Sequence, residues 1–481
     1  MQKSVLLFGM LLVAHFGWAQ SLKPIAAKVY QAKQQSADFS KTSLFSQAAS
    51  VTTRPELAGQ WAKGLLVQPD REKIRDLRGN APDRLEISLP DPDGGALQLE
   101  LVRAQVFSQE FTVRQASDRN APVVVDPGLH YWGIVKDQPH TLAGISIFES
   151  DVVGIVYAGT EKLVFADLEQ DPSGIHIIYR ERDLASRPGF ECMSEMLEDV
   201  SDGAVAQDRS TGPDNCVRMY MEADYTIFQN KGSVAAATTY IESFFSQVAL
   251  LYANESVNMV LNELLVWDVA DPYTGPSSSN YLYQFRDALA GVYNGDLAHL
   301  VGFTGGGGIA YVDVLCNSYY GVGYSGINTT YSNVPTYSWT VEVVTHEIGH
   351  NLGSQHTHAC AWNGNNTAID GCGPAAGYSE RLQRRPAHRR HDHELLPPGF
   401  RRRYRLKPRL WPATRRSHPQ RSVQRCLPGR LRRRRPLLVR PGQFAKLRWR
   451  LGDLDRRRHR LRPHQQRYLC QQRHLFHSPA R

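Results

Sequence analysis

Acidic residues are almost absent from the last fifth of this 481-residue chain. Residues 381–481 hold 32 Lys and Arg against 4 Asp and Glu, a net charge of +28, whereas residues 1–380 hold 24 against 43, a net charge of −19. The overall charge of +9 therefore reflects the tail alone. An acidic body argues against nucleic-acid binding through a basic globular surface, so we expect no nucleic-acid partner there.

Long apolar runs are lacking too, apart from one at the N-terminus. It follows Lys3 and ends near Gly17 and Ala19, which have the small-residue spacing of a signal-peptidase site. We interpret residues 1–19 as a cleaved export signal rather than a membrane anchor, because the run is shorter than the roughly 20 residues of a span. No later stretch is expected to cross a bilayer, so the sequence predicts a secreted protein without stable membrane insertion.

Cysteines are few and odd in number. Export into an oxidising compartment favours disulfides, but an odd count leaves at least one thiol outside any intrachain pair. The spacing does not give the connectivity. The seven are Cys192, Cys216, Cys316, Cys360, Cys372, Cys426 and Cys470.

The first part of the chain divides by its sequence pattern. Residues 20 to about 80 are rich in Ala, Gln, Ser and Lys, which indicates helices and a loose leader. From Leu85 to Tyr179, apolar and β-branched residues alternate between Gly, Asp and Pro turns, which predicts antiparallel strands. The acidic stretch Met196–Asp214 is typical of a linker. We therefore expect an N-terminal region over residues 20–205 that is β-rich from about residue 85.

After Cys216 the pattern changes to strands that alternate with helices. Four segments read as strands, a helix is expected after Ser233 and another in YLYQFRDALAG, and a last helix ends near Gly353. The expected fold for residues 213–380 is an α/β (α+β) domain with a mixed, mostly parallel sheet. The four strand segments are VRMYMEADY, MVLNELLVWDV, DLAHLVGF and GGIAYVDVLC.

The last predicted helix carries the motif HEIGHNLGSQH. Residues four apart on a helix share one side, so His346 and His350 are expected to bind one metal ion. Gly353 permits the turn that brings back His356 as third ligand. Glu347 lies beside the two ligands and is expected to act as general base toward water. Three imidazoles that leave one coordination position open are typical of a catalytic zinc.

VTHEIGHNLGSQHTH resembles the metzincin zinc endopeptidases, most closely the reprolysin or adamalysin-like family. The resemblance implies a secreted metalloendopeptidase that uses zinc and acts on protein or peptide substrates. It also implies that residues 20–205 are a propeptide and that GGIAYVDVLC is the edge strand that binds extended substrate. Calcium is common in related domains, but no carboxylate cluster with ligand spacing supports it here. The oligomeric state is left open.

The same resemblance suggests that the protein is made as a latent zymogen. Cys192 precedes the linker and is a candidate cysteine switch, whose thiolate would occupy the open zinc position. A disulfide or an idle thiol is the alternative for this residue. Cys360 and Cys372 are expected to form a local disulfide, or one of them to pair with Cys316.

Metzincins carry a methionine turn after the third histidine, and this chain has no methionine after Met259. If the codons for His391–Glu394 are shifted by one nucleotide, they can read Thr-Ile-Met-Ser, which places a methionine 37 positions after His356. We interpret residues 381–481 as a frameshifted, disordered translation. A genuine basic tail that binds nucleic acid is the rival interpretation. An inactive or unstable zinc-binding remnant is a further alternative for the whole protein.

Overall fold

The computed structural model describes residues 22–35, 38–54, 57, 59–168, 171, 173–185, 192, 216–304, 307–315, 317–327, 337–357 and 359. All of these residues lie in one compact unit. The export signal, the linker and the Arg-rich tail fall outside the described residues, as do Cys316, Cys360 and Cys372. What the sequence predicts for these segments therefore stays a prediction.

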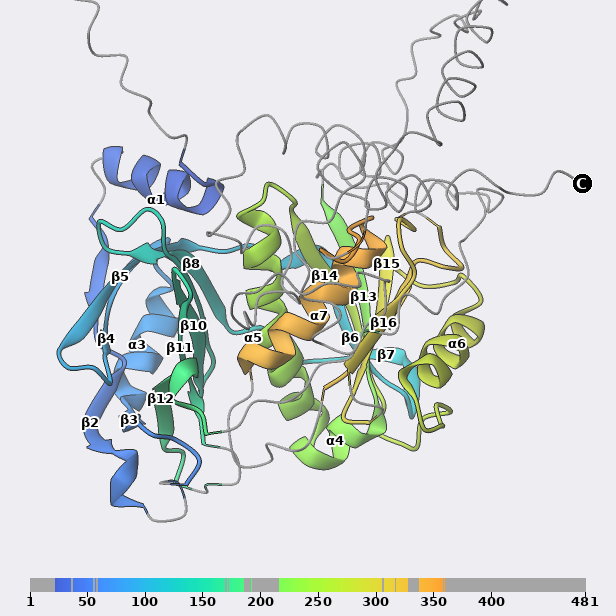
Figure 1. Ribbon diagram of the computed structural model, residues 1–481, viewed down its shortest axis with the longest axis horizontal. Coiled ribbons are helices and arrows are strands. Elements are labelled where there is room, and N and C mark those ends of the chain that lie inside the picture. The colour runs from blue at the N-terminus through green and yellow to red at the C-terminus, as the bar shows by residue number, and fades with distance from the viewer. Residues whose placement is uncertain are drawn as a thin grey trace, which may run out of the picture. The chain divides into compact units, whose positions relative to one another are not determined.

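Ten strands of the N-terminal region form one sheet, in the order β1-β4-β5-β8-β9-β10-β11-β12-β3-β2 (Figure 1). Neighbours are antiparallel, as expected, except for the parallel pair β1–β4. Helices α1 (Pro24–Gln34) and α3 (Arg71–Asn80) come from the same region. The strands are β1 (Ser40–Thr42), β2 (Phe45–Ser50), β3 (Leu65–Pro69), β4 (Arg84–Pro90), β5 (Ala96–Arg103), β8 (Leu129–Val135), β9 (Leu142–Ile147), β10 (Val152–Ala158), β11 (Glu161–Asp167) and β12 (His176–Arg180).

The β-rich part begins earlier than the sequence indicated. Three strands precede residue 85, and the first starts at Ser40. The reason is long-range pairing, because β3 is held by β12, which lies more than a hundred residues later in the chain. A local pattern cannot show such a partner.

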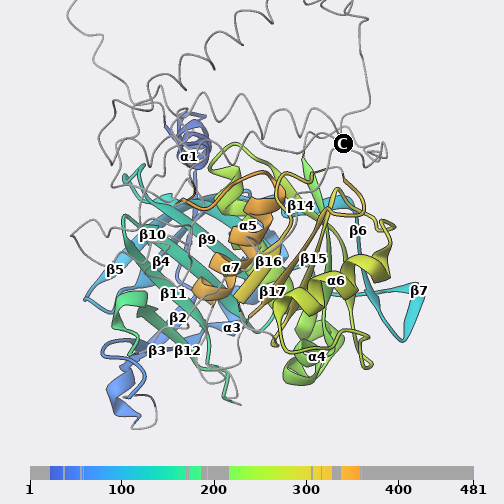
Figure 2. The same cartoon turned by 45° about the vertical axis from the view of Figure 1, so that its right-hand side comes forward.

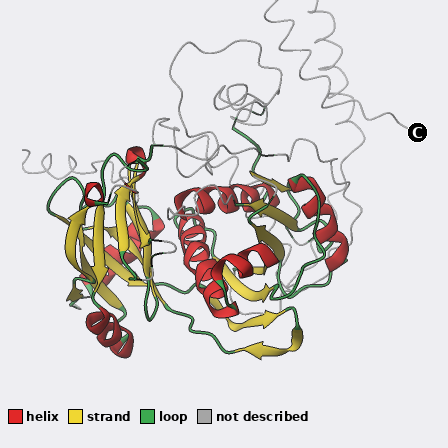
Figure 3. Cartoon of the chain, turned by 90° about the horizontal axis from the view of Figure 1, so that it is seen from below, coloured by secondary structure: helices red, strands yellow, loops and turns green. Residues whose placement is uncertain are grey.

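The second sheet has seven strands, in the order β16-β17-β15-β13-β14-β6-β7. Strands β17, β15, β13, β14 and β6 are parallel, and β16 and β7 are antiparallel to their neighbours. The expectation of antiparallel strands throughout Leu85–Tyr179 is therefore wrong for β6, which pairs in parallel with β14 of the other sheet. Figure 3 shows its strands as a block separate from those of the first sheet. The strands are β13 (Val217–Ala223), β14 (Met259–Val266), β15 (Leu297–Gly302), β16 (Gly307–Ala310) and β17 (Val322–Gly326), with β6 (Phe107–Gln115) and β7 (Asp118–Val123).

This second sheet is the core of a mixed α/β domain. The helix expected after Ser233 is confirmed as α5 (Val234–Ala253), with the Ser233 side chain accepting a hydrogen bond from the Ala236 backbone N–H. Two elements were missed: α4 (Tyr225–Lys231), and β17, which is short and contains two glycines. The segment GGIAYVDVLC was expected to be one strand, but β16 ends at Ala310. The remaining helices are α6 (Ser278–Leu289) and α7 (Tyr337–Asn351).

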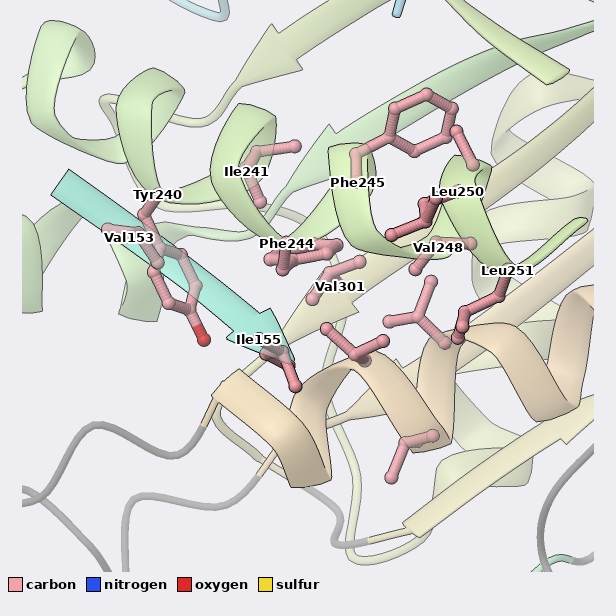
Figure 4. Close-up of a cluster of buried hydrophobic side chains, with 14 of the residues drawn as sticks. Val153, Ile155, Tyr240, Ile241, Phe244, Phe245, Val248, Leu250, Leu251 and Val301 are labelled. Atoms are coloured by element: carbon pink, nitrogen blue, oxygen red, sulfur yellow. The ribbon is translucent and has the colours of Figure 1, made fainter. Parts of the chain in front are cut away.

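Helix α5 corrects the expectation that no stretch after the N-terminal run is long and apolar enough to span a bilayer. By length and composition it is apolar enough to cross a membrane, although 78% of its most apolar window is buried inside the fold. Figure 4 shows why: side chains of α5, among them Phe244 and Leu251, belong to one buried cluster that also contains Val153 of β10 and residues of α7. Figures 1 and 2 show α5 and α7 side by side, between strands of the two sheets. An apolar surface on nearly all sides is typical of a helix that neighbouring elements cover, so the composition of α5 is that of a buried core helix.

Candidate metal centre

Helix α7 places three motif residues on one buried turn. His346 and His350 are four residues apart, and their Nε2 atoms lie 3.0 Å from each other. Both rings are buried, as is Glu347. The helix is held from behind by Tyr252 of α5, whose hydroxyl donates a 2.6 Å hydrogen bond to the Thr345 carbonyl. Burial, and then the nearby Glu347, raises the pKa of Tyr252 far above its usual value, so this donor keeps its proton.

Gly353 ends the helix in a left-handed conformation, with φ of +94°. The Gly353 N–H donates to the His350 carbonyl at 2.8 Å, and the Ser354 N–H donates to the Gly349 carbonyl at 2.9 Å. This pair of bonds is a Schellman cap, in which glycine avoids the strain that a Cβ would cause. The chain then turns back, and the His356 ring centroid comes within 4.7 Å of that of His350.

Four side chains converge at this point: Cys192, His346, His350 and His356. One ligand atom from each lies within 4.8 Å of the others, and the Cys192 Sγ is 3.4 Å from the His350 Nε2. Among the described residues, this is the one group of at least three His, Cys, Asp or Glu side chains arranged to hold a metal ion. It unites four of the site residues that the sequence singled out.

The donor set fits a zinc ion. In a tetrahedral site with metal–nitrogen distances of about 2.0–2.1 Å, two nitrogens lie about 3.3 Å apart. The 3.0 Å between the Nε2 atoms of His346 and His350 is close to this value. The Nδ1 of His350 is 2.7 Å from the Ser354 carbonyl oxygen, which can only accept a hydrogen bond. Nδ1 therefore carries the proton, and Nε2 directs its lone pair at the cluster.

Glu347 lies against a glycine that the sequence did not single out. A Cβ built on Gly308 of β16 would stand 2.4 Å from the Glu347 Oε1, so only a glycine leaves room for this carboxylate. Cys192 forms an isolated parallel β-bridge with the same Gly308. The run of four glycines at residues 305–308 was the sequence signal for this close approach. It could not be interpreted from the sequence, because the contact is with Glu347 of the distant helix α7.

Comparison with known proteins agrees with this geometry. A reprolysin-type model, described as metallo-peptidase family M12, matches residues 214–384. Over 157 residues the chain is 29% identical to snake venom metalloproteinase TM-1 of Protobothrops mucrosquamatus, covering 31% of this chain and 75% of that protein. The match to the family model spans β13–β17, α7 and all three histidines of the cluster. Residues 214–384 are therefore similar to the reprolysin-like metzincin metallopeptidases, as the motif indicated.

Proposed function

We propose that this chain is the precursor of a secreted zinc endopeptidase that hydrolyses peptide bonds in protein or peptide substrates. The observation that carries the proposal is the convergence of His346, His350 and His356 beside the buried Glu347. The family match supports a metallopeptidase. Secretion rests on the N-terminal sequence and on the likeness to a venom protein.

The three histidines would hold the zinc, with His350 oriented by the Ser354 carbonyl. When bound, the ion supplies Lewis acidity toward a peptide carbonyl and makes nearby water more acidic. Glu347 accepts a proton from the attacking water and returns it to the leaving amine. The nearby β16 edge is suited to hold an extended substrate through its backbone.

In the uncut chain, Cys192 lies at this site. It supplies the fourth atom of the ligand group and forms a β-bridge with Gly308 of β16. These contacts support a latent form in which residues 20–205 act as a propeptide and Cys192 occupies the open coordination position. Removal of the propeptide would then free both the ligand position and the strand edge.

Chelation tests the proposed enzyme. The processed protein is expected to contain about one zinc per chain and to cleave a denatured protein substrate, because three imidazoles suffice to hold a catalytic ion. Prolonged dialysis against a chelator should abolish cleavage, and stoichiometric zinc should restore it. The readouts are zinc content and peptide release; full cleavage by the metal-free protein would refute the assignment.

Replacing Cys192 with Ser tests latency. The full-length variant is expected to cleave substrate before any processing, because a hydroxyl is a much weaker zinc ligand than a thiolate. Initial rates of intact wild-type and variant chains are compared, and the same proteins after removal of the propeptide serve as the internal control, where the rates should match. Equal rates in the intact chains would show that Cys192 does not block the site.

The missing methionine turn favours a second candidate, an inactive zinc-binding protein. The family match ends at residue 384, close to where the Arg-rich sequence begins, which supports a frameshift near that point. Sequencing the gene across codons 375 to 400 distinguishes the two: an extra or missing nucleotide restores the enzyme hypothesis for the corrected chain. An intact frame, together with bound zinc and no Glu347-dependent cleavage, would favour the inactive protein.

A further inference from the structure

A hairpin of the N-terminal region extends the sheet of the metallopeptidase domain. Strand β6 pairs in parallel with β14, from Leu261 opposite Phe107 to Val266 opposite Gln115. Backbone hydrogen bonds flank the pairing at both ends: the Leu261 N–H donates to the Val106 carbonyl at 2.9 Å, and the Ala116 N–H donates to the Val266 carbonyl at 2.9 Å. The hairpin comes from the N-terminal region and adds two strands to a sheet whose other strands come from the metallopeptidase domain.

Side chains strengthen this contact. The Ser117 backbone N–H donates to the Asp268 carboxylate at 2.8 Å, and the Ser117 hydroxyl donates to the other oxygen of the same carboxylate. The Arg119 guanidinium lies 4.8 Å from the ring centroid of Trp267. Underneath, Val106 and Val113 are buried in the hydrophobic cluster that also contains Leu261 and Leu264.

The hairpin is remote from the metal centre. In the sheet order, β6 is five strands away from β16, which corresponds to about 24 Å at the usual spacing between strands. Cys192 contacts the opposite edge of the same sheet, through its bridge to Gly308 of β16. The N-terminal region therefore contacts the seven-stranded sheet at both edges: Cys192 at β16, and the hairpin at β14.

We propose that the β6–β7 hairpin is a second anchor, which keeps the N-terminal region bound to β14 and to the Trp267–Asp268 segment after the linker has been cut. The partner of this surface is the chain's own hairpin. The inference rests on the proposed function, in which residues 20–205 are a propeptide. Linked contacts dissociate far more slowly than any one alone, since each keeps the others at a high effective concentration. The hairpin adds to the contact at Cys192 and to the packing of α5 against the first sheet.

The experiment uses the full-length chain with a specific protease site placed within residues 196–214. After the cut, the proteins are diluted and the release of the N-terminal fragment is followed by size-exclusion chromatography.

The test variant is Ser117→Ala with Arg119→Ala, which removes two contacts at exposed positions. A second variant, Ala116→Pro, deletes the N–H that donates to Val266. Lys136→Ala is the matched control, because it breaks an ion pair with Glu86 inside the first sheet.

The cut wild-type fragments are expected to stay together, as are those of the Lys136→Ala control. The Ser117/Arg119 variant should release its fragment roughly tenfold faster, in proportion to the lost hydrogen bond and cation–π contact. Immediate release from the wild type overturns the proposal, and so does release of the Ser117/Arg119 variant at the wild-type rate. Complete release on Cys192→Ser alone would also overturn it. The chromatography measures binding and does not depend on activity. If the cut fragments stay together but the processed protein never cleaves substrate, the proposed enzyme activity is refuted and the proposed anchor is not.

Discussion

Replacing Glu347 with Gln is expected to lower kcat of the processed enzyme by about 10²–10⁴-fold, the range that a positioned general base contributes. Gln has nearly the same shape and fits the space beside Gly308, but its amide does not accept the proton. The zinc content should stay unchanged, because Glu347 is not among the residues grouped as metal ligands. The measurements are kcat on a denatured protein substrate and zinc per chain.

A matched replacement on the same helix provides the control. Glu342 of α7 pairs with Lys162 of the first sheet, so Glu342→Gln changes a carboxylate outside the metal cluster. After the propeptide is removed, this control should turn over at the wild-type rate. If Glu347→Gln retained wild-type turnover, Glu347 would not be the base.

Glu242→Gln is expected to stabilise the uncut protein by several kcal/mol near pH 8 and to have a much smaller effect near pH 4.5. Glu242 lies on α5 and is fully buried, and neither carboxylate oxygen has a hydrogen-bond partner within the part of the chain that the structure describes. Burial, and to a lesser extent the nearby Asp126, raises the pKa of Glu242 from 4.5 to about 9.

The sign of this pH dependence follows from proton binding. Below pH 4.5 the carboxyl is protonated in both the folded and the unfolded chain, so its ionisation does not change the free energy of unfolding there. Between pH 4.5 and 9 the unfolded chain releases this proton while the folded chain retains it, and the free energy of unfolding falls by at most about 6 kcal/mol. Gln does not titrate, so its advantage over Glu should grow with pH across this interval.

Thermal unfolding of both proteins at pH 5 and pH 8 measures the effect. The difference in Tm between variant and wild type should be larger at pH 8. Glu149→Gln, the same change at an exposed position, is the control. A Tm difference independent of pH would mean that Glu242 is ionised in the folded chain.

The parts of the fold that were predictable are those whose information is local. The helix cap at Ser233 and the motif from His346 to His356 each lie within a few residues, so spacing indicated α5 and the convergence of the three histidines. Contacts between distant segments were not predictable. The pairing of β6 with β14, the strands before residue 85 and the approach of Gly308 to Glu347 all depend on partners far away in the chain.

The departure of β6 would change what β14 presents to its surroundings. Residues Met259–Val266 form a largely apolar strand, which the hairpin keeps from being the outermost one. Without that cover, a row of backbone N–H and C=O groups faces solvent and invites pairing with another molecule. Activation would therefore carry a risk of self-association, and the uncut precursor is the form in which this protein is best stored.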